Sequence, residues 1–134
     1  MLLEKLGTVQ CTARNKMLPG EGAFPKFETT AEGTGTLGGS NVKSLATYQG
    51  GIRADGFLEG EVPNSGVIMT DDGVATYRAT GIGSFTEDGG SSLKGVVYFN
   101  ATAPSLASLN GVAVAYSWDV DGEGNATWEM WALK

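Results

Sequence analysis

Residues 55–90 read DGFLEGEVPNSGVIMTDDGVATYRATGIGSFTEDGG and contain three Asp-Gly pairs. The pairs are Asp55-Gly56, Asp72-Gly73 and Asp88-Gly89. Aspartate tolerates a positive φ angle and glycine prefers one, which is what the tight turn of a β-hairpin requires. Between the pairs lie two runs with many β-branched residues, so the stretch predicts two adjacent antiparallel strands, residues 57–69 and 74–85.

The same pattern continues in both directions along the chain. A fourth pair, Asp121-Gly122, marks another hairpin, and no stretch keeps helical spacing of apolar residues for more than a turn or two. Residues 14–24 and 103–110 form longer connections, and the second has room for one helical turn. The predicted strands are residues 2–13, 25–37, 42–52, 57–69, 74–85, 92–102, 111–120 and 126–133.

Eight strands joined in sequence predict an all-β fold. Closing such a meander removes the unpaired edges that an open sheet exposes, and an even number of strands allows every neighbouring pair to be antiparallel. The 21 glycines, several of them inside strands, are typical of sharply bent strands. We therefore predict a closed eight-stranded up-and-down antiparallel barrel that occupies residues 1–134 as a single domain.

Composition and charge exclude several classes of function. The net charge of −6 disfavours nucleic acids and anionic membrane surfaces as partners, and no apolar run approaches the roughly 20 residues that cross a bilayer. One cysteine and the absence of a signal-like start predict a cytoplasmic protein. Because the chain has no histidine, it cannot form a Ser-His or Cys-His pair or a histidine-ligated metal site. We predict no cofactor and lean against an enzyme.

Alternation along the strands divides the side chains between two faces. The face assigned to the barrel lumen carries Phe27, Ala31, Leu37, Tyr48, Ile52, Ala75, Tyr77, Ala79, Phe85, Leu93, Val97, Phe99, Val112, Val114, Tyr116, Trp118, Trp128 and Met130. Cys11 also points inward, where a thiol is normally an inert apolar group. The glutamates at positions 28, 32, 59 and 61 fall on the outer face, where solvation is their ordinary role.

The outer face of the last three strands is less polar than a solvated wall. It carries Val96, Tyr98, Ala113, Ala115, Trp131 and Leu133. An exposed apolar area of this kind marks an interface, so we predict a homo-oligomer that packs through these strands. The alternative is that the connection at residues 14–24 folds over this face.

The stretch DVDGEGN at residues 119–125 begins like a calcium loop, with acidic residues at alternate positions. Counting from Asp119 as the first position, the twelfth position is Met130 instead of a bidentate glutamate, and both flanks are predicted strands instead of helices. A hairpin turn explains Gly122 and Gly124 fully. We therefore predict no metal site.

Five aromatic residues on the inner face are the candidate ligand-binding residues. Tyr48, Tyr77, Tyr116, Trp118 and Trp128 combine large apolar surfaces with polar tips that can orient a flat ligand. The alternative is that they only fill the core, since eight-stranded barrels can be packed solid. The sequence leaves three functions open: a barrel that binds a small apolar or aromatic molecule, an isomerase or cyclase that acts in the lumen, and a protein-interaction module with a packed lumen.

Three runs resemble known proteins: GTGTLGG at 33–39, YQGGIRADGFLEGEVPNSGVIMTDDGVATYRATGIGSF at 48–85, and LASLNGVAVAYSWDVDGEGNATWEMW at 106–131. They are similar to a family of small uncharacterised bacterial β-barrel proteins and, more distantly, to the calycin-like barrels related to allene oxide cyclase. The resemblance implies a closed eight-stranded barrel, frequent oligomers, and a lumen that holds a ligand or controls a cyclisation. No catalytic motif of the cyclases matches, so the resemblance supplies no catalytic residue.

Overall fold

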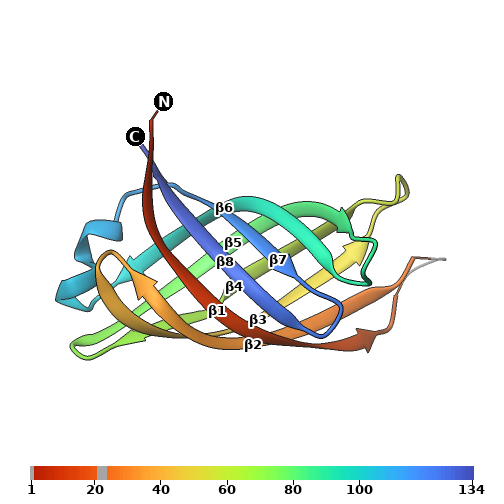
Figure 1. Cartoon of the computed structure of the whole chain (residues 1–134), viewed down its shortest axis with the longest axis horizontal. Coiled ribbons are helices and arrows are strands. Elements are labelled where there is room, and N and C mark those ends of the chain that lie inside the picture. The colour runs from red at the N-terminus through yellow and green to blue at the C-terminus, as the bar shows by residue number, and fades with distance from the viewer. Residues whose placement is uncertain (1, 21–23) are drawn as a thin grey trace.

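The computed structural model describes residues 2–20 and 24–134, and its strands form one closed antiparallel barrel (Figure 1). Each strand pairs with the next one in the chain, and the eighth pairs with the first. The elements are β1 (Leu3–Leu18), β2 (Lys26–Leu37), β3 (Ser40–Ile52), β4 (Leu58–Thr70), β5 (Gly73–Phe85), β6 (Ser91–Ala101), the 3₁₀ helix η1 (Pro104–Leu109), β7 (Val114–Val120) and β8 (Asn125–Leu133). The predicted eight-stranded up-and-down barrel is confirmed.

Glycines in the left-handed region make the tight turns. Gly38 and Gly39, with φ angles of 59° and 82°, form the two-residue turn between β2 and β3. Gly89, in the turn between β5 and β6, has a φ of 86°. In the last turn the left-handed residue is Gly124, with a φ of 88°, although the sequence pattern pointed to Gly122. The Asp-Gly pairs therefore locate the turns without always identifying the glycine that each turn requires.

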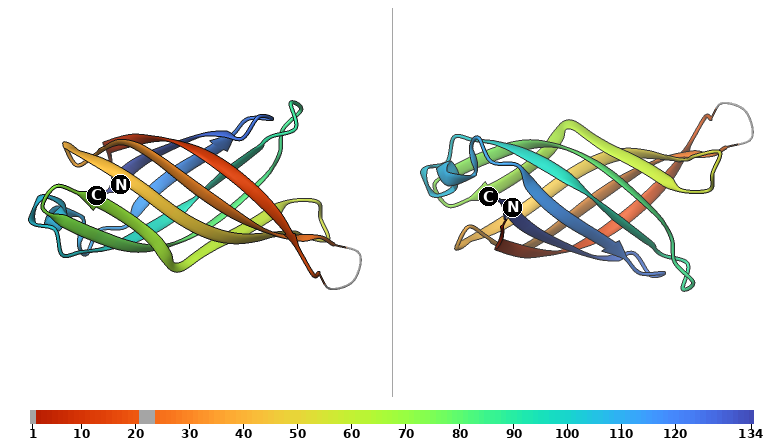
Figure 2. Two further views of the ribbon diagram at one scale, coloured as in Figure 1. Left: turned by 90° about the horizontal axis from the view of Figure 1, so that it is seen from below. Right: turned by 90° about the horizontal axis from the view of Figure 1, so that it is seen from above.

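The ladder between β1 and β8 closes the barrel. Val9 pairs with Trp128, and at the end of the ladder Leu2 and Lys134 exchange two backbone hydrogen bonds of 2.8 Å. The two ends of the chain accordingly lie together at one end of the barrel (Figure 1). Two further views show the strands wrapping obliquely around a common lumen (Figure 2). Closure gives every strand a hydrogen-bonded neighbour on both sides.

The predicted inner face is buried or half-buried with one exception, Phe85, whose side chain is 57% exposed. Phe85 has the inward parity of its strand, but it stands at the last paired position of β5, opposite Ser91. The first buried residue of β6 is Leu93, which lies two residues beyond Ser91 on the same face of the strand. The prediction for Phe85 is wrong because alternation assigns a face to a residue and does not say where the filled lumen ends.

The first strand is longer than predicted. Residues 14–18 continue β1, with Arg14 paired to Thr30 and Met17 to Phe27, so the predicted connection at residues 14–24 is wrong for these positions. The strand continues because β2 supplies a partner, even though its side chains project past the core and Met17 is 65% exposed. Residues 14–18 therefore do not cover the outer face, and residues 21–23 lie outside the described residues.

The 3₁₀ helix η1 closes one end of the lumen. Its Leu106 and Leu109 are buried, at 0% and 2% exposure. Asn110 anchors the helix to β6, because its side chain accepts a hydrogen bond from the backbone N–H of Ala101 (2.7 Å) and donates one to the carbonyl of the same residue (3.0 Å). In the described residues, no helix has both the length and the apolar character needed to span a membrane.

A bulge in β4 breaks the regular pairing between β4 and β5. Val62 pairs with Ala79 and Gly66 with Tyr77, so three residues of β4 stand opposite one residue of β5. Asn64, within the bulge, has a φ of 61°. The strand bends visibly at this point (Figure 2). Bulges of this kind increase local bending and help a sheet to close.

Candidate functional site

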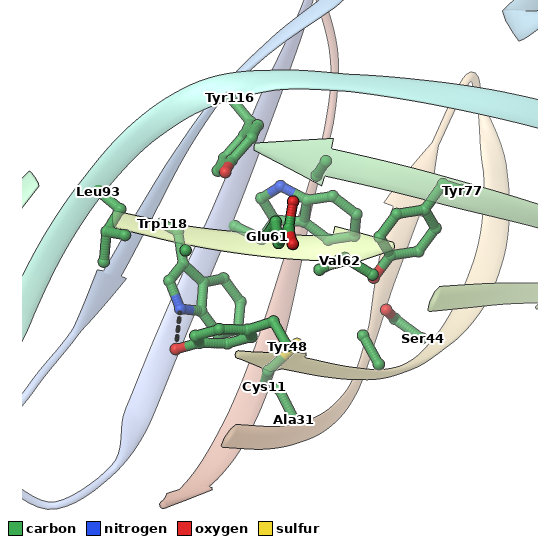
Figure 3. A pocket seen from close by; sticks show the side chains of 14 residues that line it. Cys11, Ala31, Ser44, Tyr48, Glu61, Val62, Tyr77, Leu93, Tyr116 and Trp118 are labelled. Carbon is green, nitrogen blue, oxygen red and sulfur yellow. Dashed lines mark hydrogen bonds between the residues drawn. The ribbon is translucent and has the colours of Figure 1, made fainter. Parts of the chain in front are cut away.

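A cavity of about 60 Å³ lies in the middle of the lumen (Figure 3). It exists because inward positions of four strands, β1, β2, β3 and β5, carry small side chains at this depth. These are Cys11, Ala31, Ser44, Ala46 and Ala79. Larger side chains from β7 and β8 fill the opposite half of the lumen. The space is therefore what remains when small residues face large ones across the barrel.

All five predicted aromatic residues line this cavity. Tyr48 comes from β3, Tyr77 from β5, Tyr116 and Trp118 from β7, and Trp128 from β8. Alternation points each of them inward, and the closed ring brings together strands that are far apart in sequence. Tyr77, Trp118 and Trp128 are buried, whereas Tyr48 and Tyr116 are half-buried.

Trp128 is the centre of an aromatic cluster. Its ring lies 5.2 Å from that of Tyr77 and 6.3 Å from that of Tyr116, measured between centroids. The Trp118 ring meets it edge-on at 6.5 Å, with an angle of 86° between the planes. Aromatic pairs at these separations stabilise a protein beyond the burial of their area, by roughly 0.5–1.5 kcal/mol each. The cluster gives the cavity one rigid aromatic wall.

Few polar atoms face the cavity, and most are already paired. The Tyr116 hydroxyl donates to the backbone carbonyl of Thr80 at 2.9 Å. The indole N–H of Trp118 donates to the hydroxyl of Tyr48 at 3.1 Å. The Ser44 hydroxyl is a polar neighbour of a third group, the Tyr77 hydroxyl. The cavity is thus an apolar space with hydroxyl groups at its edges.

Three titratable groups that line the cavity, Cys11, Tyr77 and Tyr116, stay uncharged at neutral pH. Burial raises the pKa of the Cys11 thiol to about 11 and the pKa of Tyr116 to about 12. Burial also raises the pKa of Tyr77, and the neighbouring Ser44 hydroxyl opposes this shift only in part. None of the three has the pKa near neutrality that suits a general acid or base. Among the described residues, these groups give no support to the isomerase or cyclase alternative.

Three glycines that the sequence did not single out together lie in register beside the half-buried tyrosines, and Gly60 among them lines the cavity. Gly60 pairs with Gly81 across β4 and β5, and Gly81 pairs with Gly95 across β5 and β6. A Cβ atom on Gly81 would lie 2.4 Å from the Tyr116 hydroxyl oxygen, and one on Gly60 would lie 3.7 Å from the Tyr48 ring. The row lets the barrel wall approach the two tyrosines. Recognising it requires the strand register, because each glycine alone is an ordinary strand glycine.

The carboxylates predicted to face outward do so. Glu32, Glu59 and Glu61 are exposed, and Glu28 is half-buried. Glu61 borders the cavity, but it alternates outward between the inward-facing Gly60 and Val62 and its side chain is exposed. None of these four carboxylates therefore lies in the lumen.

The acidic stretch at residues 119–125 forms the hairpin turn between β7 and β8. One oxygen of the Asp121 carboxylate accepts hydrogen bonds from the backbone N–H groups of Glu123 and Asn125, both at 2.9 Å. These bonds lower the pKa of Asp121. In residues 2–20 and 24–134, no group of three or more His, Cys, Asp or Glu side chains is placed to hold a metal ion.

The chain matches no protein-family model and no curated protein. Three solved structures share its fold. A protein of unknown function from Clostridium acetobutylicum has a TM-score of 0.83 at 15% identity, over 100% of both chains. A conserved protein of unknown function from Rhodopseudomonas palustris has a TM-score of 0.80 at 13% identity, over 98% of this chain and 96% of the other.

The third is a beta-barrel like protein from Acinetobacter baumannii, with a TM-score of 0.78 at 15% identity over 99% of this chain and 96% of the other. All three come from bacteria, and all three extend over almost the whole barrel. They confirm the predicted similarity to small barrel proteins without assigned functions. At these identities the similarity concerns the fold alone.

Proposed function

We propose that this barrel binds a small, neutral, mainly apolar molecule in its lumen. The observation that carries the proposal is the cavity itself, lined by aromatic side chains from four strands and by small side chains from four. Apolar pockets with a few placed polar groups are the usual form of small-molecule sites. A lumen filled only for stability would have larger residues than alanine and serine facing this space.

The size of the cavity limits the ligand. A water molecule needs roughly 10–15 Å³ of such volume, so about 60 Å³ has room for about four to six water-sized groups. Sites for drug-sized ligands are larger, at roughly 300–1,000 Å³. The proposed ligand therefore has about four to six non-hydrogen atoms, which excludes fatty acids and fused-ring compounds.

The electrostatics of the cavity limit the ligand as well. The thiol of Cys11 and the hydroxyls of Tyr77 and Tyr116 have raised pKa values, so none of them is charged at neutral pH. A charged ligand would lose its hydration without gaining a counter-charge, which is costly. The proposed ligand is uncharged for this reason.

Titration with benzene, followed by two-dimensional NMR of the whole chain, tests the proposal. We expect saturable shifts at residues that line the cavity, and we expect Ala79→Val to abolish them because its added methyl groups enter the empty space. The matched control is Ala75→Val, at a fully buried inward position of β5 that does not line the cavity. This control should keep the shifts and lose about 1–3 kcal/mol of stability through overpacking. Absence of saturable binding by the wild-type chain would contradict the proposal.

We also infer that the outer face of the last strands is a contact surface for a second copy of the chain. The strand register places Trp131 beside Ala115 and Ala115 beside Val96, so outward apolar side chains of β8, β7 and β6 form a continuous row. Tyr98, on the same face of β6, is 49% exposed. Such a row supports an interface between barrels.

Light scattering of the purified chain checks this inference. We expect an oligomer that Ala115→Glu converts to monomers, because the charge would be buried between Val96 and Trp131 without a partner. Leu45→Glu is the control, at a 43% exposed position on β3, which is distant from β7 in the ring. It should leave the oligomer intact. A monomeric wild-type chain at all concentrations would show the inference to be wrong.

A further inference from the structure

One hydrogen bond crosses the lumen between opposite walls of the barrel. It runs from the indole N–H of Trp118 on β7 to the hydroxyl of Tyr48 on β3, over 3.1 Å (Figure 3). In the order of the eight strands, β3 and β7 lie opposite one another. The two rings meet edge-on, with centroids 6.3 Å apart and planes at 89°. The Tyr48 hydroxyl is therefore held at a fixed place beside the cavity.

The bond uses only the acceptor capacity of the Tyr48 hydroxyl. An indole N–H can only donate, whereas a phenol has one hydrogen to donate and also accepts. Within residues 2–20 and 24–134, no hydrogen bond from the Tyr48 hydroxyl to an acceptor is found, whereas the Tyr116 hydroxyl donates to the Thr80 carbonyl. The hydrogen of Tyr48 is thus available to a molecule in the cavity.

The surroundings favour an uncharged acceptor. Ala46, Val62 and Leu93 border the same space, and the carboxylate of Glu61 is directed to the outer face. In such an apolar environment a hydrogen bond is stronger than it is in water. A site built to hydrogen-bond one group discriminates against an analogue that lacks it, because the analogue covers the donor without pairing it.

We propose that the Tyr48 hydroxyl, positioned by Trp118, is the specificity-determining group of the lumen and donates its hydrogen to the oxygen of a small neutral carbonyl compound. This inference rests on the proposed binding function and adds the chemical class of the ligand. A ketone, aldehyde or ester oxygen accepts a hydrogen bond without carrying a charge or requiring a second partner. Trp118 is a positioning residue, since it acts through Tyr48.

The test compares two probes of the same shape, cyclopentanone and methylenecyclopentane. The first has a carbonyl oxygen where the second has a methylene group. The dissociation constant of each is measured by NMR titration of the whole chain. We expect Tyr48→Phe to weaken cyclopentanone binding about three- to tenfold, the effect of one net hydrogen bond, and to change methylenecyclopentane binding by less than about twofold.

Trp118→Phe is the second variant, because it keeps an aromatic ring in place and removes the donor that positions Tyr48. It should reduce the preference for cyclopentanone in the same direction by a smaller factor. If Tyr48→Phe weakens both probes equally, or neither, the inference is overturned and the binding function stands. If neither probe binds the wild-type chain, both the inference and the binding function are overturned.

Discussion

The contact between Gly66 and Tyr77 gives a quantitative test of the packing around the cavity. A Cβ atom added to Gly66 would lie 2.2 Å from Cζ of the Tyr77 ring and 2.4 and 2.5 Å from its two Cε atoms. Carbon atoms in contact are normally about 3.5–4.0 Å apart, so in Gly66→Ala the ring would have to retreat by about 1.3–1.8 Å. Tyr77 is 4% exposed and lies between Phe99 and Trp128, so its neighbours obstruct that movement.

The expected loss of stability follows from this geometry. Overpacking a core costs about 1–3 kcal/mol, and disturbing the two aromatic contacts of Tyr77 adds to that cost. We expect Gly66→Ala to lose about 2–3 kcal/mol relative to a control glycine. For a chain of this length, about 3–5 °C in Tm corresponds to each kcal/mol, so the expected decrease is about 6–15 °C.

Urea unfolding followed by tryptophan fluorescence measures the difference. The control is Gly51→Ala in β3, where the added Cβ atom meets its nearest neighbour at 3.6 Å, an ordinary contact. Neither glycine has a positive φ, so both variants gain the same small benefit from a less flexible unfolded chain. If the two variants unfold within about 0.5 kcal/mol of each other, the account of the packing against Tyr77 is refuted.

Three further predictions concern the closed end, the thiol and the last turn. Leu106→Ala should lose about 2–5 kcal/mol because the leucine is fully buried beneath η1, and thermal unfolding should show no comparable loss for Leu45→Ala, which starts 43% exposed. The pKa of Cys11 rises from 9.0 to about 11 on folding, so the contribution of the thiol to stability is complete below pH 9 and is lost as the pH rises through 11. In urea titrations at several pH values, Cys11→Ala should flatten the alkaline decrease in the free energy of unfolding. An unchanged slope would contradict this assignment. Asp121→Ala should lower the Tm because two backbone N–H groups lose their acceptor, and Asp121→Asn, which keeps an acceptor oxygen, should lower it less. Millimolar calcium should leave the wild-type Tm unchanged. A calcium-dependent increase in Tm would support the metal interpretation instead.

Much of the fold could be predicted from local sequence. Asp-Gly pairs and β-branched runs located all eight strands, because turn chemistry and alternation act over a few neighbouring residues. The same alternation placed Tyr48, Tyr77 and Trp128 on the inner face, where the structure has them. The run that carries the resemblance before the seventh strand includes Leu106, Leu109 and Asn110. In the structure the two leucines are buried, and Asn110 anchors η1 to β6.

What the sequence did not reveal depends on register and depth. Residues 14–18 looked like a loop, because an exposed strand end has no apolar alternation. The row of Gly60, Gly81 and Gly95 exists only once two ladders are aligned. The volume of the cavity depends on which small residues share one level. The bulge that holds Asn64 at a positive φ has a sequence signal, Pro63 inside a strand, but its place opposite β5 depends on the register. These properties arise between strands and not within them.

The ladder between β1 and β8 also has a consequence for how the barrel folds. Every other ladder joins consecutive strands, whereas this one joins residues as distant as Leu3 and Leu133. The entropic cost of closing a chain segment rises with its length, so the hairpins can form before the seam between first and last strand. A chain halted at that stage presents two unpaired strand edges, each able to pair with another molecule. Refolding yield should therefore fall as the protein concentration rises, because chains whose seam is still open can pair with one another.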